Sequence, residues 1–235
     1  MDVREAVWQQ AESDLTIRTT DGRIEGFIWE HAQRICVSSA AIAELLGMQP
    51  SSADRDVLAA AALYQDAAWV VQFVEGSICR ADILAKPLSM VQREISADKS
   101  ADALRDIFAA KRLESVGRII REAGGRKTTN MTAQVVADAT RLDSIGPLAL
   151  FQMIHKQLED GRAIRSILET WDRQQEYHFW PARIKESLRS EPVRRIARQR
   201  LEALSTFMNA LRIHTLAEDL TEAAAQSRSK PVPFE

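Results

Sequence analysis

Cysteine is scarce in this chain, and its scarcity limits how the fold can be held together. The 235 residues include only two cysteines, Cys36 and Cys79, and both lie in apolar segments with a helical pattern. Two such residues cannot form a disulfide framework, and their spacing is not that of a metal site. They indicate a reduced protein, for which we expect a cytoplasmic location.

A basic excess is also missing. Lysine and arginine total 31 against 33 acidic residues, so the net charge is −2. This balance excludes nucleic acid and anionic membrane surfaces as expected partners. The N-terminus has no signal-peptide hydrophobic core. The run from Val57 to Val74 is apolar enough to suggest a membrane span, but Gln65, Asp66 and Gln72 interrupt it, and a carboxylate is costly in lipid. We therefore predict a buried helix there.

Strand signals and internal repeats are absent as well, whereas helical periodicity is frequent. One example is an apolar residue at every third or fourth position between residues 28 and 46. The length suits one domain with a substantial core. We predict an all-α, single helical bundle at residues 24–216, preceded by a helix and loop at 1–23 and followed by a disordered tail at 217–235.

Polar side chains interrupt two of the predicted core helices. His31 and Arg34 are three residues apart, so they share a side beside the apolar stripe of their helix. Gln65 falls on the same face as Leu58 and Trp69, and Asp66 follows it. Each of these residues alone is explained by a buried polar group that has found a hydrogen-bond partner.

Their order along the chain is more specific than any one of them. The later segment Asp138-Ala-Thr140-Arg141-Leu-Asp143 places Thr140 and Asp143 on one helix face, and Arg183-Ile-Lys185 follows. Together these segments, from about Ile24 to Leu216, resemble the HD-domain metal-dependent phosphohydrolases. The similarity is to small bacterial members related to nucleoside-triphosphate pyrophosphohydrolases. The resemblance implies an HD-domain-like bundle, a divalent metal (Mn, Fe or Mg) and nucleotide substrates.

The chain departs from the ligand set that this resemblance implies. That set is a histidine, a His-Asp doublet and a later aspartate. His31 and Asp66 match it, but Gln65 replaces the doublet histidine and Thr140 replaces the last aspartate. The attraction between two unit charges 4 Å apart is roughly 4 kcal/mol at an effective dielectric near 20, and an ion loses this attraction when one carboxylate is absent. Even half of that energy corresponds to more than about a tenfold loss of metal affinity. We therefore expect a weak or vacant metal site and no resident cofactor.

Three functional hypotheses remain. The favoured one is a non-catalytic domain that binds a nucleotide or small phosphorylated metabolite through Arg34, Arg141 or Lys185. The second is an active phosphohydrolase with a rearranged metal site made of His31, Asp66 and Asp143. The third is a helical interaction protein with a relic pocket, and a homo-oligomer is compatible with all three. The residues predicted to form the pocket are His31, Arg34, Gln65, Asp66, Asp138, Thr140, Arg141, Asp143 and Lys185.

One glycine-rich basic loop, at residues 124–129, has a simpler interpretation. Its two glycines are adjacent and no strand precedes it, so it does not match a phosphate-binding P-loop. We predict a flexible connection between helices there.

Overall fold

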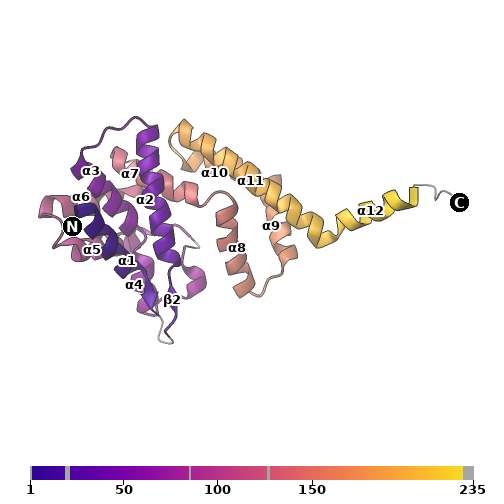
Figure 1. Cartoon of the computed structure of the whole chain (residues 1–235), viewed down its shortest axis with the longest axis horizontal. Coiled ribbons are helices and arrows are strands. Elements are labelled where there is room, and N and C mark those ends of the chain that lie inside the picture. The colour runs from indigo at the N-terminus through magenta and orange to yellow at the C-terminus, as the bar shows by residue number, and fades with distance from the viewer. Residues whose placement is uncertain (1, 19–21, 85, 126–127, 230–235) are drawn as a thin grey trace.

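The computed structural model describes residues 2–18, 22–84, 86–125 and 128–229, and it confirms the all-α fold (Figure 1). In one short hairpin, β1 (Ile17–Arg18) lies in the predicted N-terminal loop and β2 (Ile24–Glu25) lies at the start of the predicted helical bundle. The helices are α1 (Val3–Leu15), α2 (Phe27–Leu45), α3 (Ser52–Tyr64), α4 (Ala68–Val74), the 3₁₀ helix η1 (Arg80–Asp82), α5 (Met90–Leu104), α6 (Ala110–Ala123), α7 (Met131–Asp143), α8 (Pro147–Glu159), α9 (Ile164–Glu176), α10 (Phe179–Ser187), α11 (Glu191–Leu216) and α12 (Glu218–Ser229).

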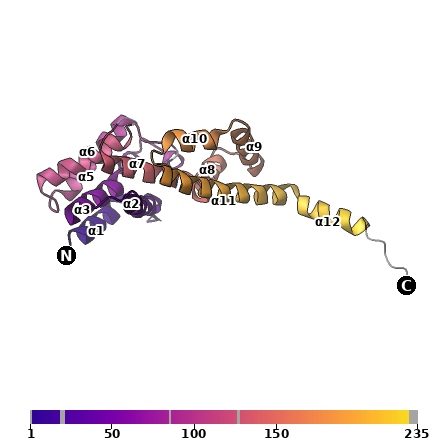
Figure 2. The same ribbon diagram turned by 90° about the horizontal axis from the view of Figure 1, so that it is seen from above.

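The helices fall into a larger body and a projecting part. Helices α1 to α7 gather at the N-terminal end, and α8 to α11 extend from them, as Figures 1 and 2 show. Helix α2 packs against both α3 and α7, and α3 also packs against α6. The fully buried alanines at positions 60 to 62 of α3 let these helices approach closely. The helices that carry the polar residues therefore meet in the core.

Local sequence signals fix the ends of these helices. Ser51 and Asp54 form a reciprocal capping box at the start of α3, and the side chain of Asn130 accepts two backbone N–H groups at the start of α7. Gly146 has a φ of +113°, and an added Cβ there would lie 3.1 Å from Cβ of Arg200. A glycine is thus required at the sharp turn before Pro147 opens α8.

The apolar run predicted as one buried helix is divided by a turn. Helix α3 ends at Tyr64 and α4 begins at Ala68, so Gln65 and Asp66 lie between the two helices rather than on a continuous helix face. The turn is tightened by bonds over three residues, and the N–H of Ala68 donates to Oγ of Ser96 at 2.9 Å. Residues 52–74 are long and apolar enough to cross a membrane, yet 78% of their most apolar window is buried inside the protein.

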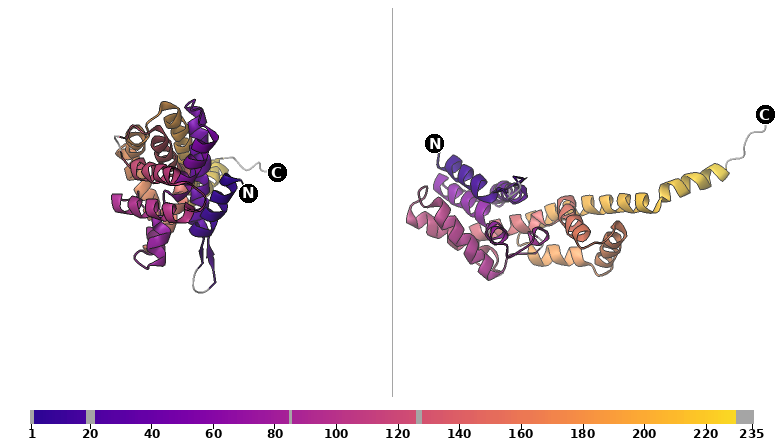
Figure 3. Two further views of the ribbon diagram at one scale, coloured as in Figure 1. Left: turned by 90° about the vertical axis from the view of Figure 1, so that its left-hand side faces the viewer. Right: turned by 90° about the horizontal axis from the view of Figure 1, so that it is seen from below.

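The C-terminal segment differs from its prediction. Residues 217–235 were expected to be disordered, but Glu218 to Ser229 form α12. Ala217 adopts a left-handed conformation, with a φ of +53°, and separates α12 from α11. Residues 218–227 are all exposed, and Figure 3 shows α12 projecting away from the body. Good helix-forming residues such as the three alanines at 223–225 account for the helix; residues 230–235 lie outside the described part.

Candidate functional site

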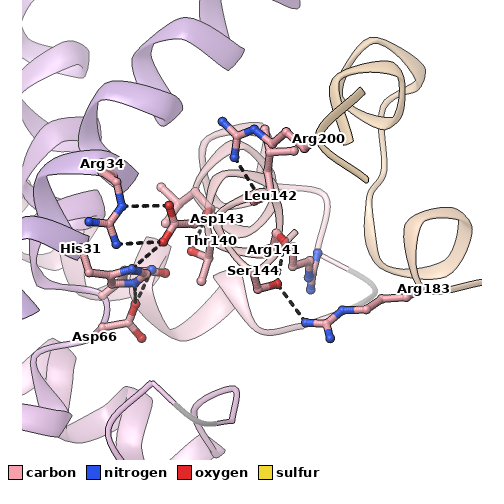
Figure 4. Close-up of polar contacts among 12 residues, drawn as sticks. His31, Arg34, Asp66, Thr140, Arg141, Leu142, Asp143, Ser144, Arg183 and Arg200 are labelled. Atoms are coloured by element: carbon pink, nitrogen blue, oxygen red, sulfur yellow. Dashed lines mark hydrogen bonds and ion pairs between the residues drawn. The ribbon is translucent and has the colours of Figure 1, made fainter. Parts of the chain in front are cut away.

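The centre of the site is His31, which lies between two carboxylates (Figure 4). Its Nε2 atom is 2.9 Å from Oδ2 of Asp66, and its Nδ1 atom is 2.9 Å from Oδ2 of Asp143. All three side chains are buried. Helix α2 supplies the histidine, the turn before α4 supplies Asp66, and the end of α7 supplies Asp143. Residues more than a hundred positions apart in the sequence thus meet at one imidazole.

This geometry determines the charge of His31. Ionised carboxylates only accept hydrogen bonds, so both ring nitrogens must donate and the ring must be an imidazolium. Burial alone would lower the pKa of His31, but the hydrogen bonds to Asp143 and Asp66 outweigh it and raise that pKa to about 9. Burial would raise the pKa of Asp143, but hydrogen bonds from His31 and Arg34 lower it to about 2.

Two further donors complete the cluster. Arg34 forms a two-pronged contact with Asp143, with Nε 3.0 Å from Oδ1 and Nη2 3.2 Å from Oδ2. The amide of Gln65 donates to Oδ2 of Asp66 at 2.6 Å. The two negative charges of the aspartates are therefore balanced by two positive charges, on His31 and Arg34. Asp66 is buried and hydrogen-bonded, as expected, and His31 is its charged partner.

These donors do not fit a divalent metal ion. Asp66 and Asp143 contact opposite nitrogens of the imidazole, so one ion could not reach both carboxylates and the ring. The hydroxyl of Thr140 donates to a backbone carbonyl of its own helix at 2.9 Å, and no carboxylate takes its place. Among the residues that the structure describes, no group of three or more His, Cys, Asp or Glu side chains could hold a metal. The geometry gives no support to a rearranged metal site.

A pocket of about 260 Å³ opens beside this cluster. His31, Gln65, Asp66, Thr140, Arg141 and Asp143 all line it, so the structure brings six of the predicted residues together. Its wall also carries four cationic side chains, which come from separate elements. They are Lys86 in the segment before α5, Arg93 on α5, Arg141 on α7 and Arg183 on α10.

Two of these cations stand out because they are partly buried and have no carboxylate partner among the described residues. Arg93 and Arg183 are half-buried, and among the described residues neither has a carboxylate within ion-pair distance. Burial lowers the pKa of both guanidinium groups, and nearby Asp66 partly offsets this for Arg93. Arg183 donates to Oγ of Ser144 at 2.8 Å and lies over the Trp180 ring, 5.6 Å from its centre. Arg183 is therefore held in place without losing its charge.

Glycine at position 124 makes room for one of these cations. A Cβ at Gly124 would lie 1.8 Å from Cζ of Arg93, so the guanidinium of Arg93 occupies the space that a side chain would fill. Gly124 also lines the pocket. The glycine-rich loop therefore contributes to the site through its first residue; Arg126 and Lys127 lie outside the described residues.

Three predicted pocket residues are placed elsewhere. Asp138 is buried behind the pocket, where it accepts the backbone N–H of Arg189 at 3.3 Å and pairs with Arg141 at 3.8 Å; burial raises its pKa. Arg34 contacts Asp143 but does not line the pocket; it lines two neighbouring hollows instead. Lys185 is exposed on α10 and does not line the pocket.

Simple helix geometry explains the error at Lys185. It is two residues from Arg183 on the same helix, which places the two side chains about 200° apart around the axis. Arg183 faces the pocket, so Lys185 faces solvent. The segment Arg183-Ile-Lys185 contains both residues, and because only one of the two can face the pocket, helix geometry could have pointed to Arg183 as the alternative. Nothing in the sequence around Lys86 or Arg93 distinguished them from ordinary surface cations.

A second hollow, of about 510 Å³, adjoins the pocket. The two share Leu84, Ser144, Gln152 and Arg183 as wall residues. The second hollow adds apolar side chains from two elements, namely Phe27 on α2 with Leu148 and Phe151 on α8. A cationic pocket thus continues into a partly apolar one, with Arg183 at their junction.

No protein-family model matches this sequence, and no curated protein matches it. Its fold is similar to the crystal structure of YpgQ from Bacillus subtilis, with a TM-score of 0.55 and 17% identity over 89% of this chain and 93% of that one. The Lin1889 protein from Listeria innocua gives a TM-score of 0.55 and 16% identity over 90% and 96%. YpgQ in complex with ADP gives 0.53 and 16% over 89% and 93%. At this identity, the similarity demonstrates a shared all-α fold.

Proposed function

We propose that this protein is an HD-like domain that binds a nucleotide, or another small phosphorylated metabolite, without catalysing metal-dependent hydrolysis. The observation that carries the proposal is the pair of half-buried guanidinium groups, Arg93 and Arg183, which face a pocket without a carboxylate partner. A charge that is partly withdrawn from water is costly unless an opposite charge is supplied. A bound anion would supply it.

Phosphate is the anion that suits these side chains best. Guanidinium groups bind phosphate oxygens with two parallel hydrogen bonds, which gives geometric specificity as well as energy. The aspartates at the base of the pocket do not oppose such a ligand, because His31 and Arg34 already balance their charges. Lys86 and Arg141 add positive charge to the same wall.

The adjoining hollow favours a nucleotide over phosphate alone. Ligand sites combine apolar walls with a few placed polar groups, and the second hollow provides apolar walls from Phe27, Leu148 and Phe151. A phosphate near Arg183 would leave the rest of the ligand close to that hollow. The ADP complex of the similarly folded YpgQ supports a nucleotide as the first ligand to test.

The missing metal donors support a binding role rather than hydrolysis. A metal-dependent phosphohydrolase needs an ion to activate water and polarise the phosphate. Here the nitrogens of His31 are both committed to carboxylates, and Thr140 offers a hydroxyl that donates to its own helix. The protein should therefore bind ADP and leave it intact when Mn²⁺ is added.

Calorimetry with ADP tests the proposal. Because a ligand that binds only the folded state stabilises it, ADP at about a hundred times its dissociation constant should raise the melting temperature by about 5 to 10 °C. Arg93→Ala and Arg183→Ala should each weaken binding at least about tenfold, since each removes a charge-assisted contact. Arg118→Ala, at an exposed position on α6, is the matched control and should bind normally.

Two results would count against this function. Absence of ADP binding, with inorganic pyrophosphate also inactive as a ligand, would remove the nucleotide proposal and favour an interaction protein with a relic pocket. Release of phosphate from ADP or ATP in the presence of Mn²⁺, at a rate that the His31→Gln variant loses, would show that the domain is an enzyme.

A further inference from the structure

Among the described residues of the pocket wall, no carboxylate has an unbalanced charge to receive the magnesium of a magnesium nucleotide. Mg²⁺ is held by carboxylates, phosphate oxygens and water. Asp66 and Asp143 are the carboxylates among the described residues of the wall. Oδ2 of Asp66 is occupied by His31 and Gln65, and both oxygens of Asp143 are occupied by His31 or Arg34. Of these carboxylate oxygens, only Oδ1 of Asp66 is left without a hydrogen bond among the described residues, and an ion there would meet a carboxylate whose charge His31 already balances.

The same wall is unfavourable to a cation for a second reason. Four side chains on it are positively charged, whereas His31 and Arg34 already balance the charges of Asp66 and Asp143. A divalent ion bound across two phosphates would cancel most of the negative charge that these groups attract. It would also bring its own charge and its tightly held water close to Arg93 and Arg183, which cannot lose their protons.

We infer that this pocket binds its phosphorylated ligand as the metal-free anion, and that Mg²⁺ opposes the binding. The inference rests on the proposed function and specifies which form of the ligand is recognised. It separates this site from nucleotide sites in which a metal bridges a protein carboxylate and the phosphates. The guanidinium groups and Lys86 supply here the positive charge that the metal supplies there.

Calorimetric titration of the full-length protein with ADP provides the test. One titration contains EDTA, and the other contains saturating MgCl₂ with ionic strength matched by NaCl, because salt alone weakens charged contacts. We expect the dissociation constant to be at least about tenfold larger with magnesium. Lys86→Gln, at an exposed position of the wall, removes one cation and should reduce this difference without affecting the fold.

The outcomes distinguish this inference from the function on which it rests. Binding that is tighter in EDTA, with a smaller difference for Lys86→Gln, supports the inference. Binding that is equal or tighter in magnesium overturns the inference and leaves nucleotide binding intact. If ADP and inorganic pyrophosphate bind in neither buffer, the proposed function itself is wrong, and the inference falls with it.

Discussion

The unfolding free energy should decrease as the pH rises from 6.5 to about 9, because folding holds a proton on His31. The pKa of this residue rises from 6.5 to about 9 in the folded state. Below pH 6.5 both states carry the proton, so the stabilisation is complete; it is lost as the pH rises through the folded value. At 1.36 kcal/mol per pKa unit, the loss over this window is about 3 kcal/mol.

Urea denaturation at several pH values across this window measures the effect. Burial raises the pKa of the Cys36 thiol from 9.0 to about 11, so that group contributes only above the window. At the acid end, the pKa of Asp143 falls from 3.8 to about 2, so its stabilisation is present above 3.8 and is lost as the pH falls toward 2.

Two histidine variants provide the comparison. His31→Gln should abolish the decrease between pH 6.5 and 9, although it lowers the stability itself. His214→Gln, at an exposed position of α11, should keep the wild-type slope. A wild-type stability that is flat across the window, or the same slope in His31→Gln, would refute the imidazolium between two carboxylates.

Further predictions concern the pocket wall and residues 65 and 140, where the HD-domain resemblance implies metal ligands. Gly124→Ala should displace the guanidinium of Arg93 and weaken ADP binding about as much as Arg93→Ala, with an unchanged melting temperature; normal affinity in calorimetry would contradict the close approach. Asp66→Ala should destabilise the protein by about 3 to 5 kcal/mol in urea denaturation, because it leaves a buried imidazolium with one partner fewer. A denaturation midpoint equal to that of wild type would exclude this role. Gln65→His combined with Thr140→Asp should bind Mn²⁺, whereas each single change should recover much less, since the ligands of one ion act together. Elemental analysis decides this, and one metal per chain in the wild type would overturn the metal-free interpretation.

Much of the fold and the centre of the site could be predicted from local sequence. Helical periodicity indicated an all-α chain, and the polar residues within apolar segments marked His31 and Asp66. A buried carboxylate needs a charged partner, so either His31 or Arg34 was expected beside Asp66, and His31 lies there. What local sequence did not show is that Arg34 would pair with Asp143 instead, because that depends on where α7 ends relative to α2.

The cationic wall could not be predicted in the same way. Arg93 reaches the pocket because α5 packs against α6, and such packing leaves no local signal on a charged residue. The role of Gly124 depends on the same contact with Arg93. The turn at Gln65 was missed because the apolar pattern continues across it, while the bonds that close it are formed by the backbone.

Gln65 and Thr140, at the positions where the HD-domain resemblance implies a histidine and a carboxylate, have a common physical consequence. Thr140 leaves the cluster without a third carboxylate, and the amide of Gln65 gives Asp66 a hydrogen-bond donor where an imidazole would face a metal. With these residues, the protonated His31 supplies the positive charge that buried carboxylates require. A metal at Nε2 of His31 would have to displace this proton, because metal ligands bind in the deprotonated form. Metal binding by the double variant should therefore strengthen as the pH rises toward 9, over the same range in which the wild type loses stability. A metal affinity that does not change with pH would show that the proton on His31 does not compete with the ion.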